Sequence, residues 1–281
     1  MTIPTRPVLA LVQPAVQPPE LMIDVARRVE DAGLSEMWLW EDCFTASGVA
    51  PAAAILAATS TLWVGVGLFP VPLRAPSLTA MEIATLAAMF PGRFLPGLGH
   101  GVADWMARSG VAVDSPLTLL REHVTAIAAL LAGEEVNSRG RYVTLDRVQL
   151  GFPPAVVPPL YVGGRGPRTL AVGAELADGV ILDDVAPEGR ADAARVRGVT
   201  EHLAAVRGAA DRDGSTEVVG FLPTAAAATA GSVAEEVAVL WDAGVRRVLA
   251  YAGGVDGPPA SGEAITRFVD TLAAARELLV S

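Results

Sequence analysis

The chain has 281 residues, a formal net charge of −10 and no lysine, so that all 21 of its basic residues are arginine. The missing lysine excludes enzymes that need a lysine amine, such as pyridoxal enzymes, Schiff-base aldolases and phosphate-loop NTPases. The negative charge argues against nucleic acid as the main partner, because binding by counterion release needs clustered cations, and the arginines here are dispersed.

Histidine and cysteine are scarce. Three histidines (His100, His123 and His202) and one cysteine (Cys43) are too scattered for a zinc site, so we expect no metal. We expect His123 and His202 to face solvent from helices, and Cys43 to be a small buried side chain. No apolar stretch approaches about 18 residues and no signal-peptide pattern opens the chain, so we expect a cytoplasmic protein without a membrane span.

Eight short apolar runs alternate with amphipathic segments of helical length. Such near-continuous runs are typical of parallel strands that are covered on both faces. Eight units in about 250 residues match a (β/α)8 barrel, whereas a doubly wound sheet usually has about five to seven strands. We therefore predict an α/β fold, a TIM barrel, as one domain over residues 1–281. The predicted strands are 8–12, 37–40, 62–68, 94–99, 159–163, 179–182, 218–223 and 246–252.

Two helix starts and one insertion are also indicated. Ser115 before Pro116 is typical of a helix cap followed by proline in the first turn, and Ser232 with Glu235 matches a capping box. The polar segment 134–158, between helix four and strand five, fits no barrel unit. We interpret it as an insertion that forms a small hairpin around Tyr142 to Leu145.

Catalytic groups of a TIM barrel lie at the carboxyl ends of its strands. Glu41 and Asp42 follow strand two, and at most one should face the cavity, since neighbours in an extended segment point opposite ways. His100 ends strand four, where an imidazole either transfers a proton or is structural. The candidates in full are Gln13, Glu41, Asp42, Cys43, Gly67 to Pro70, His100, Gly163 to Arg165 and Asp183.

Glycines mark two of these strand ends. Gly65 and Gly67 lie inside strand three, which indicates either a bulge facing a flat ligand or close packing within the barrel. The turn Gly163-Gly164-Arg165-Gly166 leads from strand five into a helix. Its glycines, free N–H groups and arginine are suited to a phosphate, and the alternative is a plain strand-to-helix turn.

Three motifs together resemble the bacterial luciferase-like superfamily. They are Gly-Arg-Phe with Gly-Leu-Gly-His-Gly at 92–101, Val-Gly-Val-Gly leading to Pro-Leu-Arg-Ala-Pro at 64–76, and Val-Gly-Gly-Arg-Gly-Pro-Arg-Thr-Leu with Ala-Asp-Gly-Val at 162–180. The chain is most similar to the reductases and dehydrogenases that use the deazaflavin coenzyme F420. The resemblance implies F420 as cofactor, with FMN as the alternative, because FMN-dependent monooxygenases share the barrel and similar motifs.

The resemblance also implies roles for individual residues. Gly67 and Leu68 would form a strand-three bulge behind the flavin ring, often with a non-prolyl cis peptide, and the turn from Gly163 to Gly166 would bind the cofactor phosphate. The residues that we assign to the cofactor are Gln13, Gly67, Leu68, Gly99, His100, Gly163, Gly164, Arg165 and Gly166.

The catalytic residues depart from the family pattern. Glu41-Asp42 stands where several members have Asp-His, and Val102 stands where the sugar-phosphate dehydrogenases have a glutamate. Sugar-phosphate oxidation is therefore not expected. We predict that Asp42 or His100 donates or accepts the proton and that Glu41 orients.

The resemblance thus predicts an F420-dependent oxidoreductase that transfers a hydride between the deazaflavin C5 and an unidentified small organic substrate. One alternative is an FMN-dependent two-component monooxygenase that a separate reductase supplies with reduced flavin. The other is a flavin-binding barrel without catalysis. As is common in the family, we expect a homodimer through helices two and three, with no nucleic-acid or membrane partner.

Overall fold

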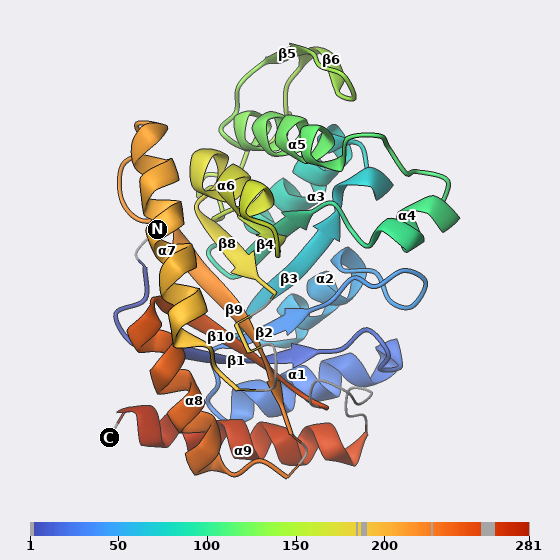
Figure 1. The fold of residues 1–281 in the computed structure, drawn as a ribbon. Coiled ribbons are helices and arrows are strands. Elements are labelled where there is room, and N and C mark those ends of the chain that lie inside the picture. Colours follow the sequence, from blue (N-terminus) through green and yellow to red (C-terminus); the bar gives the residue numbers. More distant parts are fainter. Residues whose placement is uncertain (1–2, 184, 187–189, 226, 254–261, 281) are drawn as a thin grey trace.

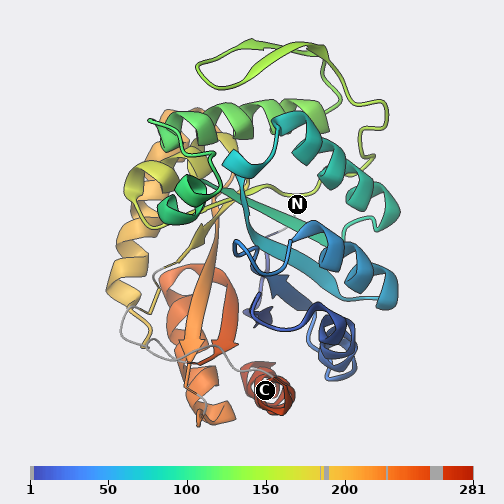
Figure 2. The ribbon, with the colours of Figure 1, turned by 90° about the vertical axis from the view of Figure 1, so that its right-hand side faces the viewer.

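Eight parallel strands close into a barrel that helices surround (Figures 1 and 2). The structure, a computed structural model, describes residues 3–183, 185–186, 190–225, 227–253 and 262–280. The strands follow one another around the barrel in sequence order and close by pairing of β1 with β10, so the predicted TIM barrel is confirmed. They are β1 (Val8–Gln13), β2 (Glu36–Leu39), β3 (Trp63–Pro70), β4 (Phe94–Gly99), β7 (Tyr161–Gly164), β8 (Gly179–Leu182), β9 (Glu217–Thr224) and β10 (Val245–Ala252).

The helix starts were predicted correctly in one case and wrongly in the other. Ser115 is the N-cap of α5 and Pro116 its first residue, as expected. The capping box of α8 consists of Thr229 and Ser232 rather than Ser232 and Glu235, because Thr229 caps the helix one turn earlier. The helices are α1 (Met22–Asp31), α2 (Val49–Ala58), α3 (Pro76–Met89), α4 (Ala103–Arg108), α5 (Pro116–Leu131), α6 (Pro167–Leu176), α7 (Ala193–Ala209), α8 (Ala230–Ala243) and α9 (Glu263–Val280), with short 3-10 turns η1 (Pro19–Leu21) and η2 (Val71–Leu73).

The insertion forms the predicted hairpin, which projects beyond α5 in Figure 1. Its antiparallel strands are β5 (Val136–Arg139) and β6 (Thr144–Val148). The turn between them is fixed by Glu122 of α5, whose carboxylate accepts the backbone N–H groups of residues 141, 142 and 143 at 2.8 Å each. One carboxylate therefore anchors the hairpin to the barrel.

The barrel interior consists of layers, because alternate side chains of each strand point inward. In β2, β9 and β10 the residues of the middle layer belong to one buried cluster. Residues two positions earlier lie toward the N-terminal base, and residues two positions later lie toward the C-terminal mouth. From base to mouth the layers are Glu36, Glu217 and Arg247; then Trp38, Val219 and Leu249; then Trp40, Phe221 and Tyr251.

Charged side chains close the base of the barrel. Arg247 donates from Nε to Glu217 Oε1 at 2.7 Å and from Nη1 to Glu36. Tyr161 donates its hydroxyl to the other oxygen of Glu217 at 3.0 Å. Burial raises the pKa of Glu217 to about 7 and lowers the pKa of Arg247 to about 10. Residues at this end of a TIM barrel typically serve stability, whereas active sites lie at the opposite mouth.

Candidate functional site

The bulge predicted in β3 is present. The Gly67–Leu68 peptide is cis, and the pairing of β3 with β4 shifts register between Val66 and Phe69. Gly65 has a different role, because a Cβ built there would lie 2.1 Å from the ring of Trp38. Close packing inside the barrel therefore explains Gly65, whereas Gly67 belongs to the bulge at the mouth.

Leu68 and two glycines form a floor at the mouth. A Cβ at Gly99 would lie 2.4 Å from Leu68 Cδ2, and a Cβ at Gly163 would lie 2.5 Å from the same atom. The Leu68 side chain thus lies directly over the backbone of β4 and β7. Only glycine at positions 99 and 163 leaves room for that side chain. Three of the residues assigned to the cofactor are brought together here.

The turn between β7 and α6 presents an open helix N-terminus. Gly166 is the N-cap of α6, no side chain caps the helix, and a Cβ at Gly166 would meet no atom within 4 Å. By contrast, a Cβ at Gly164 would lie 2.7 Å from Thr169 Cγ2. Arg165 is exposed, and its Nε donates to Asp183 at 2.6 Å. Free N–H groups at a helix N-terminus are suited to an anion.

His100 lies beside this turn. Its Nε2 is 3.0 Å from Thr169 Oγ1, and both residues line a cavity of about 530 Å³ together with Gly166. Burial lowers the pKa of His100, although a hydrogen bond with the backbone of Gly101 opposes the shift. Because Gly99 faces the barrel axis, strand alternation turns His100 toward the helix layer. His100 therefore lies next to the turn between β7 and α6, called the anion turn below, rather than on the axis.

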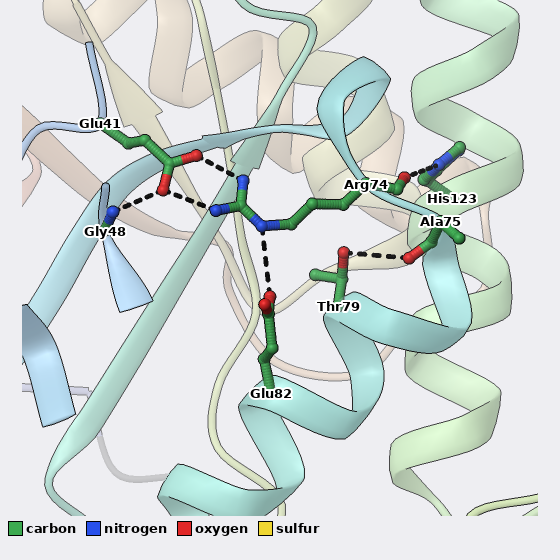
Figure 3. A network of polar contacts seen from close by, with 7 residues as sticks. All are labelled: Glu41, Gly48, Arg74, Ala75, Thr79, Glu82 and His123. Atoms are coloured by element: carbon green, nitrogen blue, oxygen red, sulfur yellow. Dashed lines mark hydrogen bonds and ion pairs between the residues drawn. The ribbon is translucent and has the colours of Figure 1, made fainter. Parts of the chain in front are cut away.

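Glu41 is engaged on both oxygens (Figure 3). Arg74 donates to Glu41 Oε2 from Nη2 at 2.8 Å and to Oε1 from Nη1, and the backbone N–H of Gly48 also donates to Oε2. The Nε of Arg74 lies 3.2 Å from Glu82 Oε2. Glu41 is only 8% exposed, so its predicted orienting role would be exercised through Arg74 and Gly48.

Asp42 and Cys43 line a pocket of about 450 Å³ next to this ion pair. Burial raises the pKa of the half-buried Asp42 carboxyl. Phe44, Leu73 and Leu78 supply apolar walls. A carboxyl group in such a setting is suited to proton transfer, because its proton is held more tightly than in water. Cys43 is partly exposed rather than buried as predicted.

Gln13 is the predicted residue with the most unusual surroundings. It is completely buried, and neither atom of its amide has a hydrogen-bond partner in the described part of the chain. Strand alternation places Gln13 with Leu9 and Leu11, which face the helix layer, and not with Ala10 and Val12. Its assignment to the cofactor stays a prediction.

Sequence reasoning missed the aromatic side of the mouth. The ring centroid of Trp40 lies 4.9 Å from that of Tyr251 and 5.7 Å from that of Phe221, both in edge arrangements. Burial raises the pKa of Tyr251, and Asp183 raises it further. The alternation of Glu36, Trp38 and Trp40 would have indicated that Trp40 points into the barrel.

His123 contradicts the expectation that it faces solvent. It is 4% exposed, with Nδ1 3.0 Å from the carbonyl oxygen of Leu119 and Nε2 3.2 Å from that of Arg74. The reason is its position within the apolar stripe of α5, one turn after Leu119 and Leu120. Burial lowers its pKa. His202 is exposed on α7, as predicted.

The chain matches known proteins along almost its whole length. The sequence profile of the luciferase-like monooxygenase family matches residues 1–277. The chain belongs to the luciferase-like monooxygenase family. This confirms the resemblance seen in the three motifs. No described helix is long and apolar enough to cross a membrane, and the described residues contain no cluster of three or more potential metal ligands from histidine, cysteine, aspartate and glutamate.

Individual relatives show more specific likeness. A 5,10-methylenetetrahydromethanopterin reductase of Archaeoglobus fulgidus is 33% identical over 160 residues, which cover 57% of this chain and 48% of the relative. An F420-dependent glucose-6-phosphate dehydrogenase of Nakamurella multipartita is 29% identical over 178 residues, 58% of this chain and 52% of the relative. The aligned part thus spans about half the length of these relatives.

The fold is closely similar to that of solved structures. An F420-dependent secondary alcohol dehydrogenase, solved with an F420-acetone adduct, superposes with a TM-score of 0.83 over 97% of this chain and 100% of that chain. The sequence identity is only 18%, so this likeness establishes the barrel and not the reaction.

Proposed function

We propose that the protein is an F420-dependent oxidoreductase that transfers a hydride between the deazaflavin and a small organic substrate. The observation that supports this most is the mouth of the barrel, where Leu68 of the β3 bulge packs on Gly99 and Gly163 to form a floor. The relatives named above include a dehydrogenase described as F420-dependent, which favours the deazaflavin over FMN.

The residues present fit such a cofactor. The floor offers the Leu68 side chain as a surface for a planar ring, because the glycines at 99 and 163 let that side chain lie close against the backbone of β4 and β7. The open N-terminus of α6 at Gly166 offers N–H groups for a phosphate, which matters in a chain without lysine. When bound, F420 would supply the hydride acceptor or donor.

The protein's own contribution is binding and proton transfer. Asp42 would hold or release the substrate proton in the 450 Å³ pocket that it lines, because burial has raised the pKa of its carboxyl group. The carboxyl group of Asp42 in that pocket disfavours an anionic substrate such as a sugar phosphate, so a small, uncharged substrate is favoured. His100 and Thr169 would support the anion turn.

Titration with F420 and with FMN tests the cofactor. We expect F420 to bind at least about tenfold more tightly, which requires only about 1.4 kcal/mol of differential binding. Absorbance of the bound cofactor measures both affinities. Tighter binding of FMN would favour the two-component monooxygenase. Binding of F420 without reduction by any of a panel of secondary alcohols would favour a barrel that binds without catalysis.

Gly166→Asp tests the phosphate site. Aspartate at the N-cap should stabilise α6 by accepting the N–H of Arg168, because Pro167 has no N–H and that of Thr169 donates to the Gly166 carbonyl oxygen. The same aspartate should repel a phosphate from this end of the helix. A Cβ at Gly166 meets nothing within 4 Å, so the fold should not change. We expect at least about a tenfold rise in the Kd of intact F420, since each charge-assisted hydrogen bond contributes about 1.5–3 kcal/mol.

Two controls isolate this effect. Gly151→Asp adds the same charge at another glycine whose Cβ would be unobstructed, and should leave the Kd unchanged. A deazaflavin fragment without phosphate should bind Gly166→Asp as it binds the natural protein. Weakening of both ligands alike would place the phosphate elsewhere. Gly164→Val is a less suitable variant, because Thr169 already fills the space beside Gly164.

We also propose that the protein forms a homodimer through α2 and α3. Three large apolar side chains of α3 are exposed, namely Leu78 at 46%, Met81 at 55% and Met89 at 62%. The sequence of α2 contains no charged or polar residue at all. Exposed apolar patches of this kind are typical of interfaces. Sedimentation equilibrium checks the proposal, and a monomeric mass at micromolar concentration would contradict it.

A further inference from the structure

Arg74 connects three elements at the edge of the mouth (Figure 3). It follows η2 and precedes α3, and its side chain is only 13% exposed. Its guanidinium binds Glu41 after β2 with two nitrogens and Glu82 of α3 with the third. Its carbonyl oxygen faces Nε2 of His123 on α5 at 3.2 Å. Its Cζ atom also lies 5.2 Å from the ring centroid of Phe69.

Through this contact Arg74 also holds a loop. Glu41 Oε2, which Arg74 binds, accepts the backbone N–H of Gly48, the N-cap of α2. The carboxylate of Glu41 therefore joins the two ends of segment 42–47. That segment forms one wall of the 450 Å³ pocket, and Arg74 and Leu73 line the same pocket.

The geometry requires arginine. A planar guanidinium makes two parallel bonds to one carboxylate and still has Nε free for another acceptor, whereas lysine offers a single point charge. Without the cation, Glu41 would be a buried carboxylate without compensation, and it would gain by turning toward water. Turning would break its bond to Gly48 and release the segment.

We propose that Arg74 is a positioning residue: acting through Glu41, it holds segment 42–47, with Asp42, as a fixed wall of the substrate pocket. The role of the pocket as the substrate site rests on the proposed function. The positioning of the segment does not, because it follows from the contacts of Arg74, Glu41 and Gly48 alone.

Cys43 provides a direct readout of the segment. It is the chain's one cysteine, it is partly exposed, and it lies within the segment. Its reaction with Ellman's reagent as a function of pH gives the limiting rate of the thiolate and the apparent pKa of the thiol. Burial raises the pKa of Cys43, the charges of Glu41 and Asp42 raise it further, and Arg74 lowers it.

In Arg74→Met we expect the limiting thiolate rate to rise at least about tenfold, as local opening of the segment exposes the sulfur. The apparent pKa of the thiol should rise as well, because the cation is lost. Arg74→Lys should restore most of the pKa but little of the rate, since it keeps the charge without the two parallel bonds. Arg121→Met is the matched control, because it breaks the ion pair with Glu175 elsewhere on the barrel and should change neither quantity.

An unchanged limiting rate in folded Arg74→Met, or full restoration of the rate by lysine, would overturn the proposal. If Arg74→Met does not fold, Glu41→Leu replaces it as the test, because leucine cannot accept the N–H of Gly48. The same rise is expected in the thiol rate and in hydrogen exchange of amides 42–48. An unchanged rate and exchange in folded Glu41→Leu would equally overturn the proposal. Titration of the natural protein with F420 tests a separate point. If the natural protein does not bind F420, the proposed function is refuted, but the thiol rates still test the positioning role of Arg74.

Discussion

Arg247→Met is expected to lower the free energy of unfolding by about 3–5 kcal/mol, because it leaves two buried carboxylates at the base of the barrel without their cation. The side chains of Arg247, Glu36 and Glu217 are 5%, 4% and 0% exposed, so water cannot replace the lost partner. Denaturation by urea measures the change. Arg28→Met is the control, since the Arg28–Asp270 pair is exposed and such pairs contribute about 0–1 kcal/mol.

The loss should depend on pH. The folded-state pKa of Glu217 is raised to about 7 from an ordinary value of 4.5. A carboxyl group shifted in this direction contributes stability that is fully present below pH 4.5 and is lost as the pH rises through about 7. Without Arg247 no cation offsets the burial of the Glu217 carboxylate, so the variant should lose more stability at pH 8 than at pH 5. Equal losses would show that lost packing, and not charge, is responsible.

The barrel could be predicted because its signal is local. Each strand is a short apolar run, and every predicted strand lies within two residues of the observed one. The base network gives no such signal. Glu36 and Arg247 are 211 positions apart, and each stands near the start of a strand, where a charged residue is ordinarily a boundary. Only closure of the barrel makes them neighbours.

Two local backbone features of the candidate site could be predicted for the same reason. The bulge at Gly67 and the turn before Gly166 are local patterns of glycine, and the structure has both. Arg74 was missed as a functional residue because its partner Glu41 lies 33 positions away. His123 was misplaced because residue type was given more weight than its position in the apolar stripe of α5. Its burial follows from that position.

The identity of the proton-transferring residue gives the other large effect that we expect. Sequence alone left Asp42 and His100 as alternatives, and the structure places them in different pockets. Asp42 lines the pocket beside the mouth, whereas His100 bonds to Thr169 beside the anion turn. We therefore expect Asp42→Asn to lower kcat by about 10²-fold or more while leaving the Kd of F420 unchanged. The substrate is whichever secondary alcohol or other small molecule in the panel reduces F420.

His100→Ala should have the opposite effect on the two quantities: the Kd of F420 should rise, while kcat stays within about tenfold of the natural value. Thr169→Val should give the same result, because Thr169 is the hydrogen-bond partner of His100. The pH profile adds an independent readout. In the direction of substrate oxidation Asp42 must be ionised, so kcat/KM should fall as the pH drops through its raised pKa, and this limb should be absent in Asp42→Asn. If His100→Ala instead loses turnover and the limb survives in Asp42→Asn, the imidazole transfers the proton. The substrate must then lie toward α6, because His100 faces that helix and not the pocket lined by Asp42.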